Sequence, residues 1–306
     1  MNTIELAAAF QKELDKRMVS DSTTGWMELN SNLVQYNGGA EIKIPDITLD
    51  GLADYDRGKG FTDGDIVLKF QTHTMTQDRG RSFMLDAMDV NESNFVATAG
   101  AVMKEFQDTM VIPEIDAYRY SKIASLAMEN NRASYGYEPD ESTIFKQLTD
   151  DITMVQDKIG TNKKVIVTMS IATANILNNN EKISKSLNTT EFKQGEITTR
   201  VKSINDVPII TAPSDWLKTA YNFYSGVDEE AKGGFETGET AKTINWIIAA
   251  ENAPIAVSKQ DTMRIFEPTE NINADAYKIN YRRYHDLWIP KNKMQSVWVN
   301  IREQED

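Results

Sequence analysis

The chain of 306 residues contains no cysteine and only two histidines. Without cysteine, a disulfide framework, a thiolate metal site and a cysteine nucleophile are all excluded. The histidines, His73 and His285, are separated by most of the chain, and neither belongs to an HExxH or similar metal-binding spacing. We therefore expect no bound metal and no cofactor, and a structural role for both histidines.

Long apolar runs are missing too, because nowhere do about 18 apolar residues follow one another. The first residues also lack the basic region and the apolar core of a secretory signal. The sequence therefore predicts a soluble protein with no membrane partner.

Positive charge is scarce, since 33 basic residues stand against 46 acidic ones and the formal net charge is −13. Basic pairs such as Lys163–Lys164 and Arg282–Arg283 are isolated, whereas phosphate binding needs clustered lysine and arginine. Sequence-specific binding of nucleic acid is not expected. An acidic wall is nevertheless suited to enclosing nucleic acid, because repulsion keeps the polymer from adhering to it.

The motifs of common enzymes are also missing. Neither a Walker loop nor a G-x-S-x-G elbow occurs, and the glycines of residues 233–238 lack the spacing of a dinucleotide fingerprint. The adjacent acids Asp150–Asp151 and Glu229–Glu230 leave a carboxylate-based hydrolase as a distant alternative. Neighbouring acids usually form a solvated face, so the sequence favours a protein that is not an enzyme.

The most informative segment that is present spans residues 39–88. Apolar and polar residues alternate over 40–45 and 66–71, which predicts two strands, and residues 51–64 between them are rich in turn-forming glycine and aspartate. A third strand, 79–88, returns to the body. Because an isolated hairpin is marginal in water, it must dock on its own domain or on a neighbouring molecule.

Helical patterns flank this hairpin on both sides. Leu6, Phe10, Leu14 and Met18 recur every fourth residue and predict an amphipathic helix. An apolar stripe over residues 91–130 predicts a long helix with a kink at Pro113. A further helix is expected over 144–159, ended by Gly160.

The rest of the chain alternates between strands and loops. A strand at 165–169 leads to Ser170, which is suited to cap a following helix. Residues 221–243 are rich in glycine and acid and predict a long surface loop. Further strands are expected at residues 198–204, 207–211, 244–250, 263–266, 276–289 and 297–301. The last two of these are expected to pair with each other.

Two stretches carry a family resemblance: residues 88–93 (MDVNES), which lead into the long helix, and residues 111–123 (VIPEIDAYRYSKI) within it. Together with the order of elements, they make the chain similar to the major capsid protein of tailed bacteriophages, of the kind found in phages of Gram-positive bacteria. The resemblance implies an α+β fold of the Hong Kong 97 type. Its parts would be an N-terminal arm (1–38), an E-loop hairpin (39–88), the spine helix of the P-domain (89–130), an A-domain (131–268) and the return strands of the P-domain (269–306).

The resemblance also implies a function. Such subunits form hexamers and pentamers, which close into an icosahedral head around double-stranded DNA without reading its sequence. Portal and scaffolding proteins would be partners, with decoration or head-completion proteins as further ones. Assembly would take place in the cytoplasm of the host bacterium, and the protein would end in the virion. Many relatives carry a cleaved scaffolding segment before the arm, and since none precedes it here, either a separate scaffolding protein or an already processed chain is expected. An encapsulin-like nanocompartment shell, which shares the fold, is the alternative.

Contacts between subunits are expected at two sets of side chains. Apolar rows on the hairpin should cover the spine or P-domain of a neighbour, while basic residues should pair with its acidic surplus. The apolar candidates are Phe10 and Leu14 of the arm and Ile42, Ile44, Ile66, Leu68 and Phe70 of the hairpin, and the basic candidates are Arg57, Lys59, Arg79 and Arg81. Because some relatives join subunits through a Lys–Asn isopeptide bond, Lys59 is also the candidate for such a link, although the sequence indicates no Asn partner.

Overall fold

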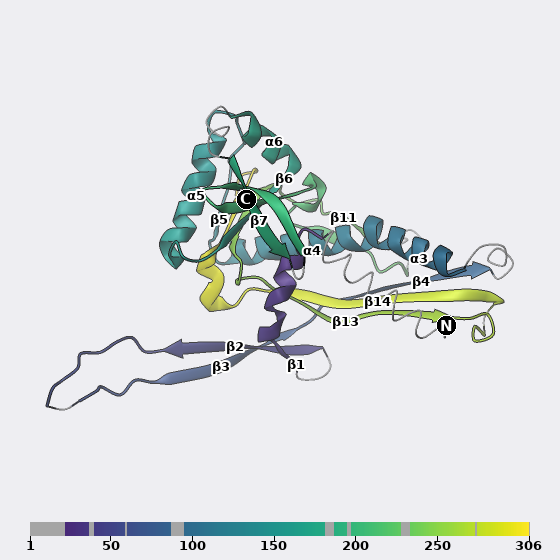
Figure 1. The fold of residues 1–306 in the computed structure, drawn as a ribbon, viewed down its shortest axis with the longest axis horizontal. Coiled ribbons are helices and arrows are strands. Elements are labelled where there is room, and N and C mark those ends of the chain that lie inside the picture. The colour runs from purple at the N-terminus through teal and green to yellow at the C-terminus, as the bar shows by residue number, and fades with distance from the viewer. Residues whose placement is uncertain are drawn as a thin grey trace.

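The structure is a computed structural model that describes residues 22–36, 40–58, 60–86, 95–180, 187–194, 197–227, 233–272 and 274–305. Figure 1 shows three parts: a hairpin that projects to one side, a slab of helix and sheet that extends to the other, and a lobe above their junction. The predicted N-terminal helix, residues 88–93 and Lys59 lie outside the described residues.

The helical elements are η1 (Gly25–Leu33), α3 (Phe95–Phe106), the π-helical segment η2 (Gln107–Val111), α4 (Ile112–Glu129), α5 (Ile144–Ile159), α6 (Ile171–Asn179), η4 (Ser214–Trp216) and η5 (Lys291–Ser296). The strands are β1 (Gln35–Tyr36), β2 (Glu41–Leu49), β3 (Ile66–Thr74), β4 (Gln77–Asp86), β5 (Ala133–Ser134), β6 (Val165–Ser170), β7 (Leu187–Gln194), β8 (Ile197–Ile204), β9 (Val207–Ala212), β10 (Tyr221–Phe223), β11 (Phe235–Thr237), β12 (Ile244–Ala250), β13 (Ile255–Phe266), β14 (Ala276–Trp288) and β15 (Val297–Ile301). Among the described helices, none combines the length and the apolar character needed to cross a membrane.

The hairpin consists of β2, β3 and the residues between them. The two strands pair antiparallel from Glu41 opposite Thr74 to Leu49 opposite Ile66, and β1 adds a short third strand beside β2. Beyond the strands, Asp50 Oδ2 accepts a hydrogen bond from the Asp65 backbone at 2.8 Å. The two-stranded hairpin predicted from the sequence is therefore confirmed.

The slab is formed by α3, η2 and the first half of α4, packed on a three-stranded sheet of order β13-β14-β4. Side chains of both layers share one buried cluster: Met103, Val111, Ile112, Ile115, Met263, Ile279 and Tyr281. The predicted long helix is present, but its irregularity is the wider π-helical turn at Gln107–Val111, which ends two residues before Pro113. Proline lacks an N–H and clashes with the carbonyl four residues earlier, so a regular α-helical turn is unfavourable there.

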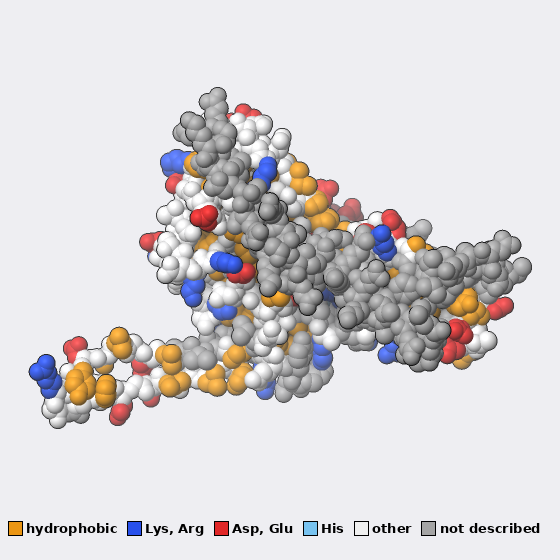
Figure 2. All heavy atoms as spheres, viewed as in Figure 1, with side chains coloured by type: hydrophobic (Ala, Val, Ile, Leu, Met, Phe, Trp, Pro, Cys, Tyr) orange, Lys and Arg blue, Asp and Glu red, His pale blue; other side chains and the backbone are white. Residues whose placement is uncertain are grey.

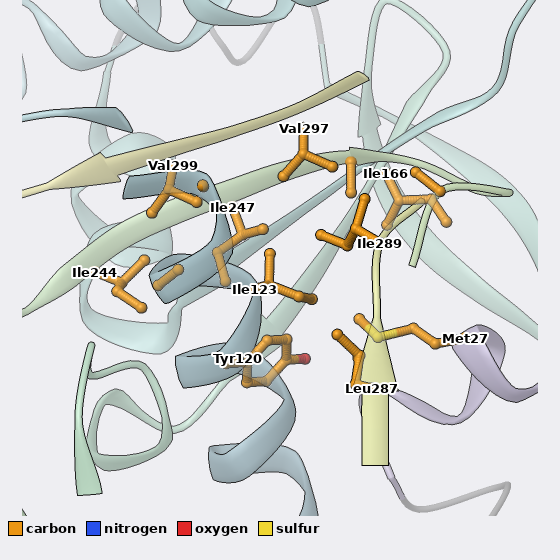
Figure 3. Close-up of a cluster of buried hydrophobic side chains, with 14 of the residues drawn as sticks. Met27, Tyr120, Ile123, Ile166, Ile244, Ile247, Leu287, Ile289, Val297 and Val299 are labelled. Atoms are coloured by element: carbon orange, nitrogen blue, oxygen red, sulfur yellow. The ribbon is translucent and has the colours of Figure 1, made fainter. Parts of the chain in front are cut away.

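The lobe contains a seven-stranded sheet of order β5-β15-β12-β6-β9-β8-β7. The second half of α4 covers one face of this sheet, and Figure 3 shows Tyr120 and Ile123 of that helix among sheet residues that include Ile247 and Val299. Helices α5 and α6 cover the other face through a second buried cluster. Helix α4 thus belongs to the cores of both the slab and the lobe and joins them.

Two local signals in the sequence are confirmed in the lobe. Helix α5 ends at Gly160, whose φ of 83° is a backbone conformation that glycine adopts without strain. Ser170 caps α6, because its Oγ accepts a hydrogen bond from the Thr173 backbone at 3.0 Å.

Predictions that needed long-range information were wrong. The last two strands do not pair: β14 lies between β13 and β4, whereas β15 pairs with β12 and β5 in the other sheet. The helical turn η5 follows Pro290 and carries the chain from one sheet to the other. The expected surface loop over 221–243 also contains a short hairpin of β10 and β11.

Candidate assembly surfaces

The base of the hairpin is anchored inside this chain. Ile42 and Ile44 are buried against Val34 and Met75, and against Ile255, Val257 and Trp288 of the slab strands. The prediction that these two isoleucines cover a neighbouring subunit is therefore wrong. Their alternation reflects a core face, and three of the covering residues, Ile255, Val257 and Trp288, come from a distant part of the chain.

A second anchor lies where β3 passes into β4. Asp286 on β14 accepts hydrogen bonds from the Thr76 backbone at 2.9 Å and from the Tyr118 hydroxyl at 2.6 Å. Burial and the neighbouring Asp286 carboxylate raise the pKa of Tyr118, so its hydroxyl stays a donor. The root of the hairpin is thus fixed to both layers of the slab.

The distal part of the hairpin is exposed. Ile66 is 76 % exposed, Leu68 54 % and Phe70 42 %, and Leu49, Leu52, Tyr55 and Phe61 are also exposed. Figure 2 shows hydrophobic side chains along the projecting hairpin. Monomeric proteins rarely expose a contiguous apolar surface of this kind, and when they do it usually marks an interaction site. The three predicted contact residues Ile66, Leu68 and Phe70 lie on this surface.

The distal hairpin is also acidic. Residues 46–65 contain six aspartates and two basic residues, Arg57 and Lys59, which gives a formal net charge of −4. Arg57 is exposed, and its contact with a neighbouring subunit stays a prediction. The sequence interpretation emphasised the basic residues at the tip, but the aspartates around them outnumber them. A surface that receives this hairpin should therefore be basic as well as apolar.

Arg79 is engaged within the chain. Its guanidinium contacts the Glu114 carboxylate on α4 through two bonds, Nε to Oε1 at 2.6 Å and Nη2 to Oε2 at 3.2 Å. It also donates to the Tyr224 carbonyl at 2.8 Å and to the Gly234 carbonyl at 3.1 Å. The prediction that Arg79 pairs across an interface is corrected: it joins β4, α4 and the β10–β11 hairpin. Arg81, two residues on, is exposed.

Residues 22–24 are bound to α4 at Asp116, which is fully buried. Its carboxylate accepts hydrogen bonds from Ser22 Oγ at 2.6 Å, from the Thr23 backbone and hydroxyl at 2.8 Å each, and from the Thr24 hydroxyl. Several donors to one carboxylate offset the cost of burying its charge. This cluster fixes residues 22–24 to α4.

One helical turn further along, Glu28 lies between two arginines. Its Oε1 is 2.5 Å from Arg119 Nη2 and 2.7 Å from Arg283 Nη2. Burial disfavours the charged carboxylate, but the two guanidiniums outweigh that effect and hold the pKa of Glu28 below its usual range. The arrangement ties η1 to both α4 and β14.

Sequence reasoning missed these polar anchors. Asp116 and Arg119 interrupt the apolar stripe of the long helix, within the run from Ile112 to Ile123. A charged residue on a buried helical face must have a partner. That signal was available in the sequence, although the identity of the partners was not.

The described pair of adjacent acids that the sequence offers as catalytic candidates does not share a site. Asp150 is exposed and pairs with Lys146 at 2.5 Å, whereas Asp151 is buried and accepts a hydrogen bond from Trp246 Nε1 at 2.9 Å. These two acids therefore do not face a common substrate site. Glu229 and Glu230 lie outside the described residues. Within the described ranges, no cluster of three histidine or acidic side chains is arranged to hold a metal ion.

No protein-family model matches the chain, and no curated protein matches it. Solved structures do resemble it over most of its length. A chain of the mature capsid of bacteriophage PhiM1 is 10 % identical with a TM-score of 0.56, and the match covers 87 % of this chain and 82 % of that one. A capsid chain of cyanophage P-SCSP1u is 9 % identical with a TM-score of 0.54, covering 87 % and 84 %.

A virus-like particle from Pyrococcus furiosus gives a third match, at 11 % identity and a TM-score of 0.50, covering 95 % of this chain and 98 % of that one. At such identities the similarity concerns the fold alone. The chain has the mixed helix-and-sheet fold of phage capsid proteins.

Proposed function

We propose that this protein is the major capsid protein of a tailed phage, a structural subunit rather than an enzyme. The observation that carries the proposal is the exposed distal hairpin, an apolar and acidic surface that its own chain leaves uncovered, on a fold shared with phage capsid proteins. Such a surface is stabilised when a neighbouring copy covers it. Many weak contacts of this kind add up over a closed shell.

In more detail, we propose that the fold is of the Hong Kong 97 type. The projecting hairpin is the E-loop, the slab is the P-domain with α3 and α4 as its spine, and the lobe is the A-domain. Hexamers and pentamers close into an icosahedral head around double-stranded DNA, with portal and scaffolding proteins as assembly partners. The net charge of −13 fits a wall that encloses DNA without binding it tightly.

A nanocompartment shell is the second candidate. The specific observation in its favour is the nearly complete overlap with the virus-like particle from Pyrococcus furiosus. Its TM-score lies below those of the two phage capsid chains, so the phage capsid remains the preferred function. The contents of purified particles separate the two, because a phage head packages DNA and a nanocompartment encloses protein.

The test compares two substitutions of similarly exposed apolar residues. Leu68→Asp places a charge on the hairpin, and Ile171→Asp places one on the lobe, where the native side chain is 56 % exposed. Both variants should keep the unfolding midpoint of the native chain, since surface substitutions rarely matter for stability. Only Leu68→Asp should lose closed particles in negative-stain electron micrographs. Particles formed equally well by both variants would contradict the proposal.

A further inference from the structure

Arg119 of α4 is a buried guanidinium with one donor that no described protein group accepts. Its side chain is 1 % exposed, and both of its terminal nitrogens are engaged. Nη2 contacts Glu28 Oε1 at 2.5 Å, and Nη1 donates to Thr24 Oγ1 at 3.0 Å. Within the described ranges, no side chain or backbone group accepts a hydrogen bond from Nε. A buried N–H almost always has an acceptor, either in the protein or in an ordered water.

The ion pair between Arg79 and Glu114 shows what the same edge of a guanidinium does when one carboxylate aligns with it. Nε and Nη2 share that edge, and in Arg79 each donates to one oxygen of Glu114. Glu28 does not align with Arg119 in this way, because its Oε1 also accepts a hydrogen bond from Arg283 Nη2 at 2.7 Å. A carboxylate that serves arginines on two elements therefore leaves half of the Arg119 edge without a direct partner.

A small cavity lies where η1, α4 and β14 meet. Its walls include Glu28, Arg119, Arg283, Ile112 and Ile115. The centre of a water-sized sphere can move through about 10 Å³ of this cavity, which is about the room that one water molecule needs. A sulfate or a phosphate has five heavy atoms and does not fit, and a chloride ion is larger than a water molecule. The walls offer both a donor and an acceptor, as a buried water requires.

We infer that this cavity is a binding site for one water molecule, which joins Arg119 Nε to the Glu28 carboxylate. The water accepts the hydrogen bond of Nε–H and donates one to the carboxylate, so it satisfies the buried donor and completes the two-point contact indirectly. The inference does not depend on the proposed function. It distinguishes two attachments to α4: η1 is held through a hydrated ion pair, whereas β4 is held through the direct pair of Arg79 and Glu114.

A crystal structure of the full chain, at a resolution that shows ordered waters, tests the site. We expect one density peak within hydrogen-bond distance of both Arg119 Nε and the Glu28 carboxylate. Arg79 is the control in the same map, because its Nε should contact Glu114 with no peak between them. Direct contact of Arg119 Nε with Glu28, or a cavity without density, would overturn the inference. An anomalous peak in the cavity after a bromide soak would also overturn it, because the ligand would then be a halide.

A measurement in solution is independent of the crystal. In nuclear magnetic resonance spectra of the full chain, the Nε–H proton of Arg119 should show a nuclear Overhauser effect to water, with the sign that a long-lived bound water gives. The Nε–H proton of Arg79 should show none. Arg119→Lys and Arg79→Lys each remove one Nε–H signal and so assign the two, since lysine has no Nε. Water contacts of equal strength at both protons, or none at Arg119, would overturn the inference.

Discussion

Arg79 of β4 and Glu114 of α4 form an ion pair through two parallel hydrogen bonds, with both side chains mostly shielded from water. The same guanidinium holds two backbone carbonyls of the β10–β11 hairpin. One side chain thus connects β4, which follows the projecting hairpin, with α4 and with the β10–β11 hairpin.

Replacing Arg79 by alanine should lower the free energy of unfolding by about 1–3 kcal/mol, because Glu114 and two carbonyls lose their donor. Arg79→Lys should recover only part of this, since lysine cannot make the two-point contact. The matched control is Arg282→Ala, whose ion pair with Asp78 is exposed and should contribute less than about 1 kcal/mol. Denaturant unfolding gives both values. Equal losses for Arg79→Ala and Arg282→Ala would contradict the claim that the shielded pair contributes more to stability than the exposed one.

Asp116 should be the more sensitive anchor. Asp116→Ala removes the acceptor of four hydrogen bonds from Ser22, Thr23 and Thr24, so we expect a loss of about 3 kcal/mol or more in the free energy of unfolding. Limited proteolysis should also cut near these residues much faster than in the native chain. Asp150→Ala is the control, because that carboxylate is exposed. Unchanged cleavage in Asp116→Ala would show that this cluster does not fix the segment.

Asp151 should give the lobe an acid-dependent stability. Burial raises its pKa to about 6, against about 3.9 in an unfolded chain, and the hydrogen bonds from Trp246, Asn300 and Gln147 only partly offset this. The folded state therefore holds the proton more tightly. The stabilisation that this tighter proton binding gives the folded state is complete below about pH 4 and is lost as the pH rises through about 6. It amounts to about 3 kcal/mol at most.

Asp151→Asn resembles the protonated acid at every pH, so the variant should remove this dependence. Between pH 7 and pH 4 the native chain should gain stability relative to Asp151→Asn, as measured by urea unfolding at each pH. Asp150→Asn replaces the exposed neighbouring acid, and its stability should change with pH in the same way as that of the native chain. If the stability of the native chain changed with pH in the same way as that of Asp151→Asn, the buried carboxyl would be ionised as easily as a solvated one.

Features with a local cause were predictable from the sequence. The hairpin, the long helix, the end of α5 at Gly160 and the cap of α6 at Ser170 each follow from a pattern within a few residues. Such patterns depend on turn chemistry and periodicity, which a single segment carries.

Features decided by distant segments were not predictable from the sequence. Ile44 and Leu68 have the same alternation on paired strands, yet one is buried and the other is 54 % exposed. The difference arises because Ile255 and Trp288 cover only the base of the hairpin. The sheet assignment of β15 has the same origin, since periodicity does not state which strand is the neighbour.

The most direct test of the central claim is electron microscopy of the purified chain, produced together with a scaffolding protein and fractionated by size. The account predicts closed shells of uniform diameter that contain DNA when packaging proteins are present. It also predicts a folded protein without shells when residues 51–64 are replaced by a two-residue turn. A small oligomer of fixed size from the native chain under all conditions, or intact shells from the shortened hairpin, would contradict the account.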